Sequence, residues 1–470
     1  MAKIIVLTRK KHFTIQILTR AWGPPANCQT ANKGPFMSQS PTKAAALAAL
    51  TAAAFAAGST AQEEGGGFEI PYGNLGLNYA SAKIAEGQNY LSNDYGISPF
   101  FSYYGVIATN PHGGAHQGTN YTQEIIYGIN ADLEKILGWK NTTLTVSGAY
   151  DSGTDLSNKI GNLFTIADSS VPSGAFFYEM YIAKTFEIYD GTLQITLGRS
   201  GMADIFNTLP VFGNLVSGGL DNSAEAVFLN SPFTSSPTAT WAATAQYTFA
   251  GDEFSLAGGI YQIPRNVNSQ NYHGIDWRIN SSNGYMMLGQ FQWTPEFSPQ
   301  TKDGKKVAGT GLQGVYQVGA YCFGGYDMPK LDGSGTRGNA YGFYAQAQQM
   351  LWRDQNMLNR YVLGWVGVQY SPVKSISTMP IMGYAGFQLS GFVPGRADDS
   401  FLCSWLIGSV NSDYSTQYKA SYETAIEVSY IFQLNQNISI QPDIQYIMRP
   451  AGNSDIPDAL VLAGQIAVSF

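Results

Sequence analysis

The feature that most constrains this chain is an alternation of apolar and polar residues with period two, repeated through most of the sequence after residue 96. In 438–446, Ile, Ile, Pro, Ile and Tyr alternate with Ser, Gln, Asp and Gln, and 460–470 repeats the pattern up to the terminal Phe470. Successive side chains of a β-strand point to opposite faces, so each segment predicts a strand with one apolar and one hydrophilic face. A soluble sandwich would show the same alternation. Strand number and connection lengths must therefore decide between a soluble sandwich and a barrel that spans a membrane.

Sixteen segments carry the strand pattern. They are 97–109, 119–135, 142–150, 176–189, 192–199, 238–249, 253–263, 284–295, 311–325, 339–351, 360–370, 379–391, 400–410, 421–433, 437–449 and 458–470.

The connections between these segments alternate between short and long. Tight turns of the expected residue types stand at 189–191, 250–252 and 434–437, whereas 151–175, 200–237 and 264–283 are long. Short turns on one side and long loops on the other are typical of an outer-membrane barrel. The short turns follow even-numbered strands, which predicts that both chain ends lie on the periplasmic side. The connection 296–310 is longer than this rule predicts.

The composition agrees with a membrane barrel. Charged residues are only 13% of the chain and aromatic residues another 13%, and no run of 18 apolar residues follows residue 61. A bilayer offers no partner to backbone N–H and C=O groups, so only helices or a closed barrel can span it, and spanning helices are excluded here. We therefore predict an all-β, transmembrane antiparallel β-barrel of about 16 strands, which is wide enough to enclose an aqueous channel.

The N-terminal segment reads as a secretory signal. An Ala-rich apolar run at 44–58 follows Lys43 and precedes small residues, and it is shorter than the ~20 residues that a membrane anchor needs. We assign 37–61 to the signal peptide and 1–36 to an upstream extension or long leader. Residues 62–96 form an N-terminal periplasmic or lumenal segment compatible with a short helix, and 97–470 is the barrel.

Removing residues 1–61 changes the charge balance. Seven of the 26 basic residues and no acid lie there, which leaves 19 Lys and Arg against 33 Asp and Glu, a net charge of −14. Nucleic-acid binding then has no electrostatic basis. Two cysteines remain, Cys322 and Cys403, which is compatible with one bridge or with two thiols.

Several motifs resemble the carbohydrate-selective, OprB-type porins. They cover roughly 95–470 in family order: Tyr178-Glu179 with Leu197–Arg199, Phe228–Phe233, Gly391–Asp399 (GFVPGRADD), and Gln441–Tyr446 (QPDIQY) with Pro450–Gly452. The resemblance implies diffusion of glucose-like sugars across the outer membrane of a Gram-negative-type bacterium. The partners it implies are membrane lipid and small sugars. Porins often form trimers, and the resemblance leaves a homotrimer open.

Candidate sugar contacts fall into two groups. In sixteen-stranded porins the third long loop commonly folds into the lumen, and here this is the connection 200–237. Its candidates, which could instead anchor the loop to the wall, are Arg199, Asp204, Asn207 and Asn230. Candidates on the hydrophilic strand faces are Glu124, Asp132, Glu179, Glu427, Asp443 and Gln445. Acidic and amide groups suit a neutral polyol and disfavour anions, although a generic hydrated wall would look the same.

Other motifs carry no chemistry of their own. Arg396, Asp398 and Asp399 are expected to form a structural ion-pair cluster in a turn. The G-x-G-x-x-G at 309–314 precedes a strand and not a helix, which excludes a nucleotide loop. His112 and His116 have no third metal-binding partner nearby, so neither a metal nor another cofactor is predicted.

These observations predict a porin and not an enzyme. The expected mechanism is facilitated passive diffusion of sugars through a water-filled barrel that a loop narrows. A non-selective general porin shares every fold-level feature and is the first alternative. A barrel adhesin or enzyme is the second.

Overall fold

The structure is a computed structural model that describes residues 77–470 except 168–172, 268, 270–271, 303–304 and 415–420. The predicted leader 1–36 and signal peptide 37–61 lie outside the described residues, as does the first part of the segment 62–96.

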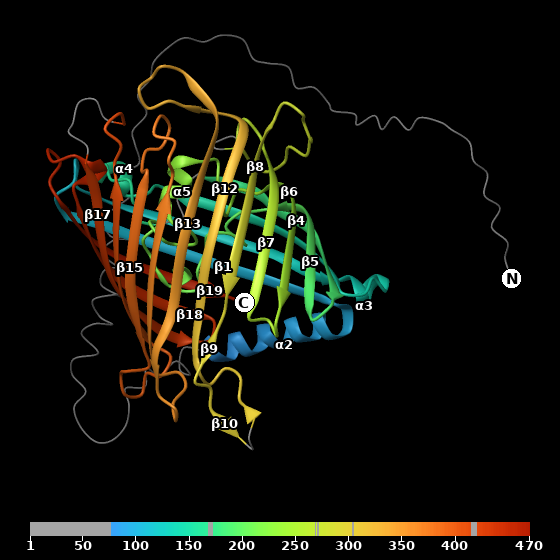
Figure 1. Ribbon diagram of the computed structural model, residues 1–470. Helices are drawn as coiled ribbons and strands as arrows, with labels where there is room; N and C mark the ends of the chain where they lie inside the picture. The colour runs from blue at the N-terminus through green and yellow to red at the C-terminus, as the bar shows by residue number, and fades with distance from the viewer. Residues whose placement is uncertain (1–76, 168–172, 268, 270–271, 303–304, 415–420) are drawn as a thin grey trace, which may run out of the picture. The chain divides into compact units, whose positions relative to one another are not determined.

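Sixteen long strands form a closed antiparallel barrel (Figure 1), as predicted. Each strand pairs with its neighbours in the sequence, β8 pairs with β12, and β19 pairs with β1 to close the ring. The barrel strands are β1 (Ile97–His112), β2 (Gly118–Asp132), β3 (Thr142–Gly153), β4 (Gly174–Ile188), β5 (Gly191–Ser200), β6 (Thr240–Phe249), β7 (Phe254–Ile263), β8 (Gly284–Trp293), β12 (Leu312–Pro329), β13 (Thr336–Arg353), β14 (Tyr361–Tyr370), β15 (Ile381–Ser390), β16 (Ser400–Ser409), β17 (Tyr422–Asn435), β18 (Ile438–Met448) and β19 (Ala459–Ser469).

Three short strands lie between β8 and β12, in the connection that is longer than the turn rule predicts. They are β9 (Glu296–Phe297), β10 (Thr301–Lys302) and β11 (Lys305–Lys306). The described helices are α2 (Leu77–Tyr95), α3 (Leu133–Leu137), α4 (Ser157–Ile160), η2 (Phe212–Asn214), α5 (Glu225–Asn230) and η3 (Pro450–Gly452). Within the described part of the chain, no helix is long and apolar enough to cross a membrane.

One strand ends earlier than predicted. The segment 119–135 was expected to be extended throughout, but β2 stops at Asp132 and α3 begins at Leu133. The Asp132 carboxylate accepts the backbone N–H groups of Glu134 and Lys135, and Gly138 ends the helix with a positive φ of 75°. A helix cap thus overrides the strand pattern at this end.

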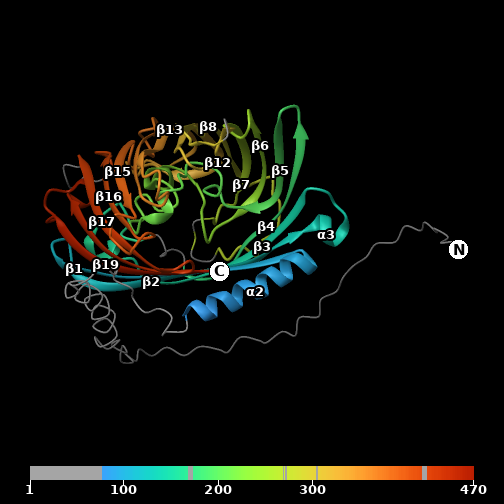
Figure 2. The same ribbon diagram turned by 90° about the horizontal axis from the view of Figure 1, so that it is seen from below.

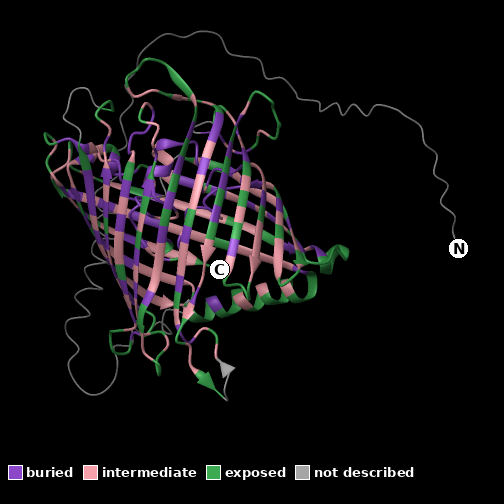
Figure 3. Ribbon diagram, viewed as in Figure 1, coloured by how far each residue is buried: buried purple, intermediate pink, exposed green. Residues whose placement is uncertain are grey.

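Buried and exposed residues alternate along the barrel strands (Figure 3), and in β18 the outer face is apolar and the inner face is largely polar. In β18, Ile444 is 49% exposed on the outer face, whereas Gln441, Asp443 and Gln445 on the inner face are 3% exposed or less. The polar face is thus the covered one, the reverse of a soluble sheet. The inner side chains must be covered by protein that lies inside the barrel.

The closing strands bring the two ends of the barrel sequence together. Tyr104 of β1 pairs with Glu124 of β2, and Val106 of β1 pairs with Gln465 of β19. Because these positions share the inner face, Tyr104, Glu124 and Gln465 lie close to one another on the lumenal wall.

Candidate functional site

The connection between β5 and β6 (201–239), here called the lumen loop, folds into the barrel (Figure 2). Most of its apolar side chains are buried, and Phe206, Phe212 and Leu220 are all 0% exposed. The Phe212 ring packs edge-on against the Tyr384 ring of β15, with 5.8 Å between the ring centroids. Burying one such ring contributes about 1.5–3 kcal/mol, and the loop shares this core with the barrel wall.

Amide side chains on the inner wall fix the turn of η2. The Val211 N–H donates to Gln348 Oε1 at 3.0 Å, and Asn214 Nδ2 donates to Gln388 Oε1 at 3.0 Å. Gln441 Nε2 in turn donates to the Asn214 carbonyl oxygen at 2.9 Å. Strands β13, β15 and β18 therefore all hold this one turn.

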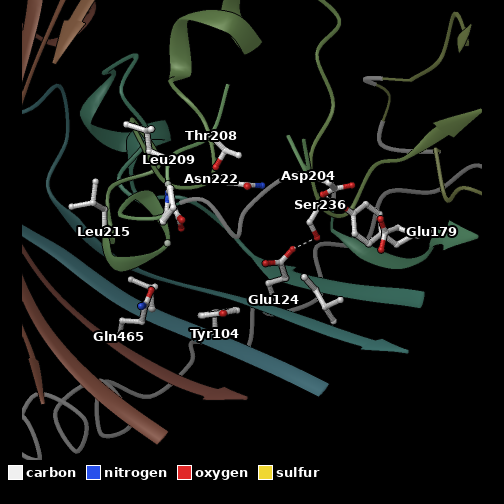
Figure 4. A pocket seen from close by; sticks show the side chains of 16 residues that line it. Tyr104, Glu124, Glu179, Asp204, Thr208, Leu209, Leu215, Asn222, Ser236 and Gln465 are labelled. Carbon is white, nitrogen blue, oxygen red and sulfur yellow. Dashed lines mark hydrogen bonds between the residues drawn. The ribbon is translucent and has the colours of Figure 1, made fainter. Parts of the chain in front are cut away.

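A cavity of about 450 Å³ separates the lumen loop from β1, β2 and β4 (Figure 4). We call it the acidic chamber, because its lining includes four carboxyl side chains, those of Glu124, Glu179, Asp204 and Asp221. No Lys or Arg is among the described residues that line it. The wall thus offers many acceptors together with a few neutral donors such as the Tyr104 hydroxyl.

Neighbouring groups hold three of these carboxylates in place. Asp204 accepts the Tyr178 hydroxyl at 3.1 Å and the Gly201 N–H at 2.8 Å. Ser147 Oγ donates to Glu179 Oε2 at 3.2 Å. The Ser236 hydroxyl of the lumen loop donates to the Glu124 carboxylate (Figure 4).

A second cavity of about 190 Å³ follows toward the short-turn end of the barrel. We call it the amide chamber, because Gln433, Gln436, Asn437, Gln441 and Gln465 line much of it. It shares three lining residues with the acidic chamber, namely Tyr104, Gly213 and Gln465. The two chambers therefore adjoin.

A third cavity of about 700 Å³ shares Gln433 and Gln436 with the amide chamber. Its lining includes the short turns around Asn359 and Asp398, so it lies at the short-turn end of the barrel. The three cavities therefore adjoin in series toward the short-turn end of the barrel.

The predicted turn cluster lines this third cavity. Arg396 Nη2 lies 2.6 Å from Asp399 Oδ1, and both side chains are nearly buried. Asp399 also accepts the Tyr430 hydroxyl at 2.9 Å and the Gln433 N–H at 3.0 Å. Asp398 accepts Asn359 Nδ2 at 2.9 Å. The cluster ties neighbouring turns together.

Of the residues proposed from the sequence as sugar contacts, the structure brings Glu124, Glu179 and Asp204 to the acidic chamber. It does not bring Asp132 there, because the carboxylate of Asp132 caps α3 at the end of β2. Arg199 is 1% exposed, and it donates to the Ala239 carbonyl oxygen at 2.7 Å and to the Tyr272 hydroxyl at 3.0 Å.

The other proposed wall residues lie beneath loops. Glu427 Oε1 accepts the Val216 N–H of the lumen loop at 2.8 Å. Gln445 Nε2 donates to the Ile166 carbonyl oxygen at 3.0 Å and to Asp443 Oδ1 at 2.9 Å. All three wall side chains are 2% exposed or less. Glu427 and Gln445 therefore hold loops to the wall, and Asp443 supports Gln445.

The two asparagines of the lumen loop are buried in the same way. Gln369 Nε2 donates to Asn207 Oδ1 at 2.6 Å, and Asn230 Nδ2 donates to the Met379 carbonyl oxygen at 2.7 Å. Neither asparagine lines the two adjoining chambers. Their geometry is that of loop anchors.

Sequence reasoning missed Tyr104, Gly213, Asp221 and Gln465 as chamber residues. The alternation does place Tyr104 and Gln465 on hydrophilic faces, and closure of the first strand on the last would have brought them together. No signal in the sequence marks Gly213, because its position depends on how the lumen loop folds.

The remaining motifs stay outside the chambers. Cys322 and Cys403 are both free thiols. The Gly-rich segment 309–314 leads into β12, as its context predicted. Among the described residues, no group of three or more His, Cys, Asp and Glu side chains could hold a metal ion.

A sixteen-stranded barrel with a loop packed in its lumen and cavities beside that loop is the architecture of a porin. Residues 116–470 match the family described as "Carbohydrate-selective porin, OprB family", and the chain belongs to this family. The family is one of channels, so the protein is a channel and not an enzyme.

Individual relatives agree with this assignment. Porin B of Pseudomonas aeruginosa is 25% identical over 413 residues, which is 78% of this chain and 86% of that protein. The high-pH structure of Pseudomonas putida OprB superposes with a TM-score of 0.71 at 21% identity, covering 82% of this chain and 97% of the other. The low-pH structure of the same protein gives a TM-score of 0.54 at 18% identity, covering 84% of this chain and 97% of the other. These two structures support the barrel fold.

Proposed function

We propose that the protein carries neutral sugars across the outer membrane by facilitated diffusion, after export directed by the segment 37–61. The solute passes the acidic chamber, the amide chamber and the cavity at the short-turn end in that order when it moves inward. The observation that carries the proposal is the series of adjoining cavities, of which the first two lie between the lumen loop and the barrel wall and the third is lined by the short turns.

The chemistry of the chamber walls favours neutral polyols. Carboxylates, amides and hydroxyls can exchange hydrogen bonds with sugar hydroxyl groups, and Tyr104 offers an aromatic face to sugar C–H groups. Neither of the two adjoining chambers has a described Lys or Arg in its lining, so an anionic solute finds no counter-charge there. Weak and numerous contacts also let the solute leave again, as conduction requires.

Liposome swelling with solutes of matched size tests the proposal. Glucose and gluconate differ mainly in charge, so a wall of acceptors should pass glucose several-fold faster, by about 1 kcal/mol of electrostatic discrimination. Amino acids of similar size complete the series. Equal rates for all of these solutes would mean a non-selective general porin, and no swelling at all would refute a channel for sugars.

A matched pair of variants locates the effect. Glu179→Gln removes one carboxylate from the acidic chamber, whereas Glu187→Gln changes an exposed carboxylate farther along the same strand, β4. We expect the glucose-to-gluconate ratio to fall in the first variant and to stay at the wild-type value in the second. The opposite ranking would remove the acidic chamber from the solute path.

A further inference from the structure

The two adjoining chambers meet at a junction with three members from different elements. Tyr104 comes from β1, Gln465 from β19 and Gly213 from η2 of the lumen loop. In Figure 4, Tyr104 and Gln465 lie on wall strands opposite the loop residues Leu209 and Leu215. A solute that moves between the chambers has to pass between these wall residues and the loop.

Gly213 is the member that leaves this junction open. A Cβ atom added at Gly213 would have no heavy atom within 4 Å, so the missing side chain points into free space. Gly219, in the same loop, is the opposite case, because an added Cβ there would lie 2.6 Å from the Leu406 side chain. Close packing therefore does not require a glycine at position 213.

The turn that carries Gly213 cannot withdraw easily. Its neighbour Phe212 is 0% exposed, and its other neighbour Asn214 is bonded through both its side chain and its carbonyl oxygen. On the wall itself, Gln465 Nε2 donates to Gln441 Oε1 at 3.4 Å. The wall and the turn are thus linked through Gln441, which fixes the separation between Gln465 and the loop.

We propose that Gly213, facing Tyr104 and Gln465, forms the fixed aperture that sets the size limit of the channel. The absent side chain provides the width, and the wall contacts of the turn keep that width constant. The inference deepens the proposed function and rests on it for the identity of the solute. The aperture itself can be tested with small ions alone.

The test compares Gly213→Trp with Gly289→Trp in planar bilayers. Gly289 is exposed on the outer face of β8, and an added Cβ there also meets nothing within 4 Å, so it is a matched control. We expect Gly213→Trp to lower the single-channel KCl conductance by about twofold or more, because a large ring then fills the path, and Gly289→Trp to leave it unchanged. Disaccharide swelling rates should fall more steeply than glucose rates.

A widening variant keeps the inference testable if Gly213→Trp fails to fold. Tyr104→Ala removes the ring on the opposite side of the junction and should raise both conductance and disaccharide rates. Wild-type conductance in a folded Gly213→Trp barrel, or in Tyr104→Ala, would overturn the aperture. Failure of the proposed function is a different result, in which sugars do not pass the wild-type channel although the ion conductance responds to these variants.

Discussion

Asn230 provides a quantitative test of how the lumen loop is anchored. It ends α5, is 1% exposed, and joins the loop to Met379 in the connection between β14 and β15. Asn230 Nδ2 donates to the Met379 carbonyl oxygen at 2.7 Å and to Ser371 Oγ at 3.1 Å, and the Met379 N–H donates to Asn230 Oδ1 at 3.1 Å.

Asn230→Ala should destabilise the barrel by about 3 kcal/mol. Met379 is itself 0% exposed, so the change leaves its N–H and C=O buried without their partner. Each orphaned group costs about 1–3 kcal/mol. Ser371 Oγ loses less, because it keeps the Tyr321 hydroxyl at 2.8 Å.

Equilibrium urea unfolding in lipid vesicles, followed by tryptophan fluorescence, measures this loss. Asn356→Ala is the control, because Asn356 is exposed in a short turn, and its change should stay within about 0.5 kcal/mol. A loss below about 1 kcal/mol for Asn230→Ala would refute the anchoring role, since two unsatisfied buried backbone groups cannot cost so little.

Three further changes probe other parts of the structure by the same unfolding assay. Arg396→Ala leaves the carboxylate of Asp399, which is 3% exposed, buried without its cation and should lower the free energy of unfolding by about 3–5 kcal/mol. Adding Asp399→Ala should restore part of this stability, and no restoration would contradict the pairing. Val366→Arg places a charge on the outer face of β14, where Val366 is 58% exposed, and should lower the free energy of unfolding in lipid by about 2–4 kcal/mol. An unchanged free energy would mean that this face does not contact hydrocarbon. Phe212→Ala removes the ring that packs against Tyr384 and should lower the free energy of unfolding by about 3–5 kcal/mol. A loss below about 1 kcal/mol would show that packing does not hold the turn.

The strands and the closure of the barrel could be predicted because both follow from local patterns. The alternation in 438–446 is visible in the sequence alone, and β18 (Ile438–Met448) puts Ile444 outside and Asp443 inside as that alternation requires. The end of β2 departed from the pattern because Asp132 caps a helix there.

The candidate site could be predicted only in part, because alternation identifies the inner face but not what covers it. Glu124 and Glu427 look alike in the sequence, yet Glu124 lines a chamber and Glu427 lies under the lumen loop. The contacts that decide this are far apart in the chain, as between Asn214 and Gln441. No local pattern encodes such pairs.

The most direct test of the central claim asks which inner-wall glutamine the solute path reaches. Gln465→Cys and Gln445→Cys would be placed separately in a chain whose Cys322 and Cys403 are replaced by Ser, and a sugar-sized thiol reagent added during bilayer recording. Gln465 lines both adjoining chambers, whereas Gln445 is 1% exposed beneath a loop. We predict that the reagent lowers the current of Gln465→Cys by about half or more and leaves that of Gln445→Cys unchanged. A block of Gln445→Cys without a block of Gln465→Cys would contradict the path between the lumen loop and the wall of β1, β2 and β19.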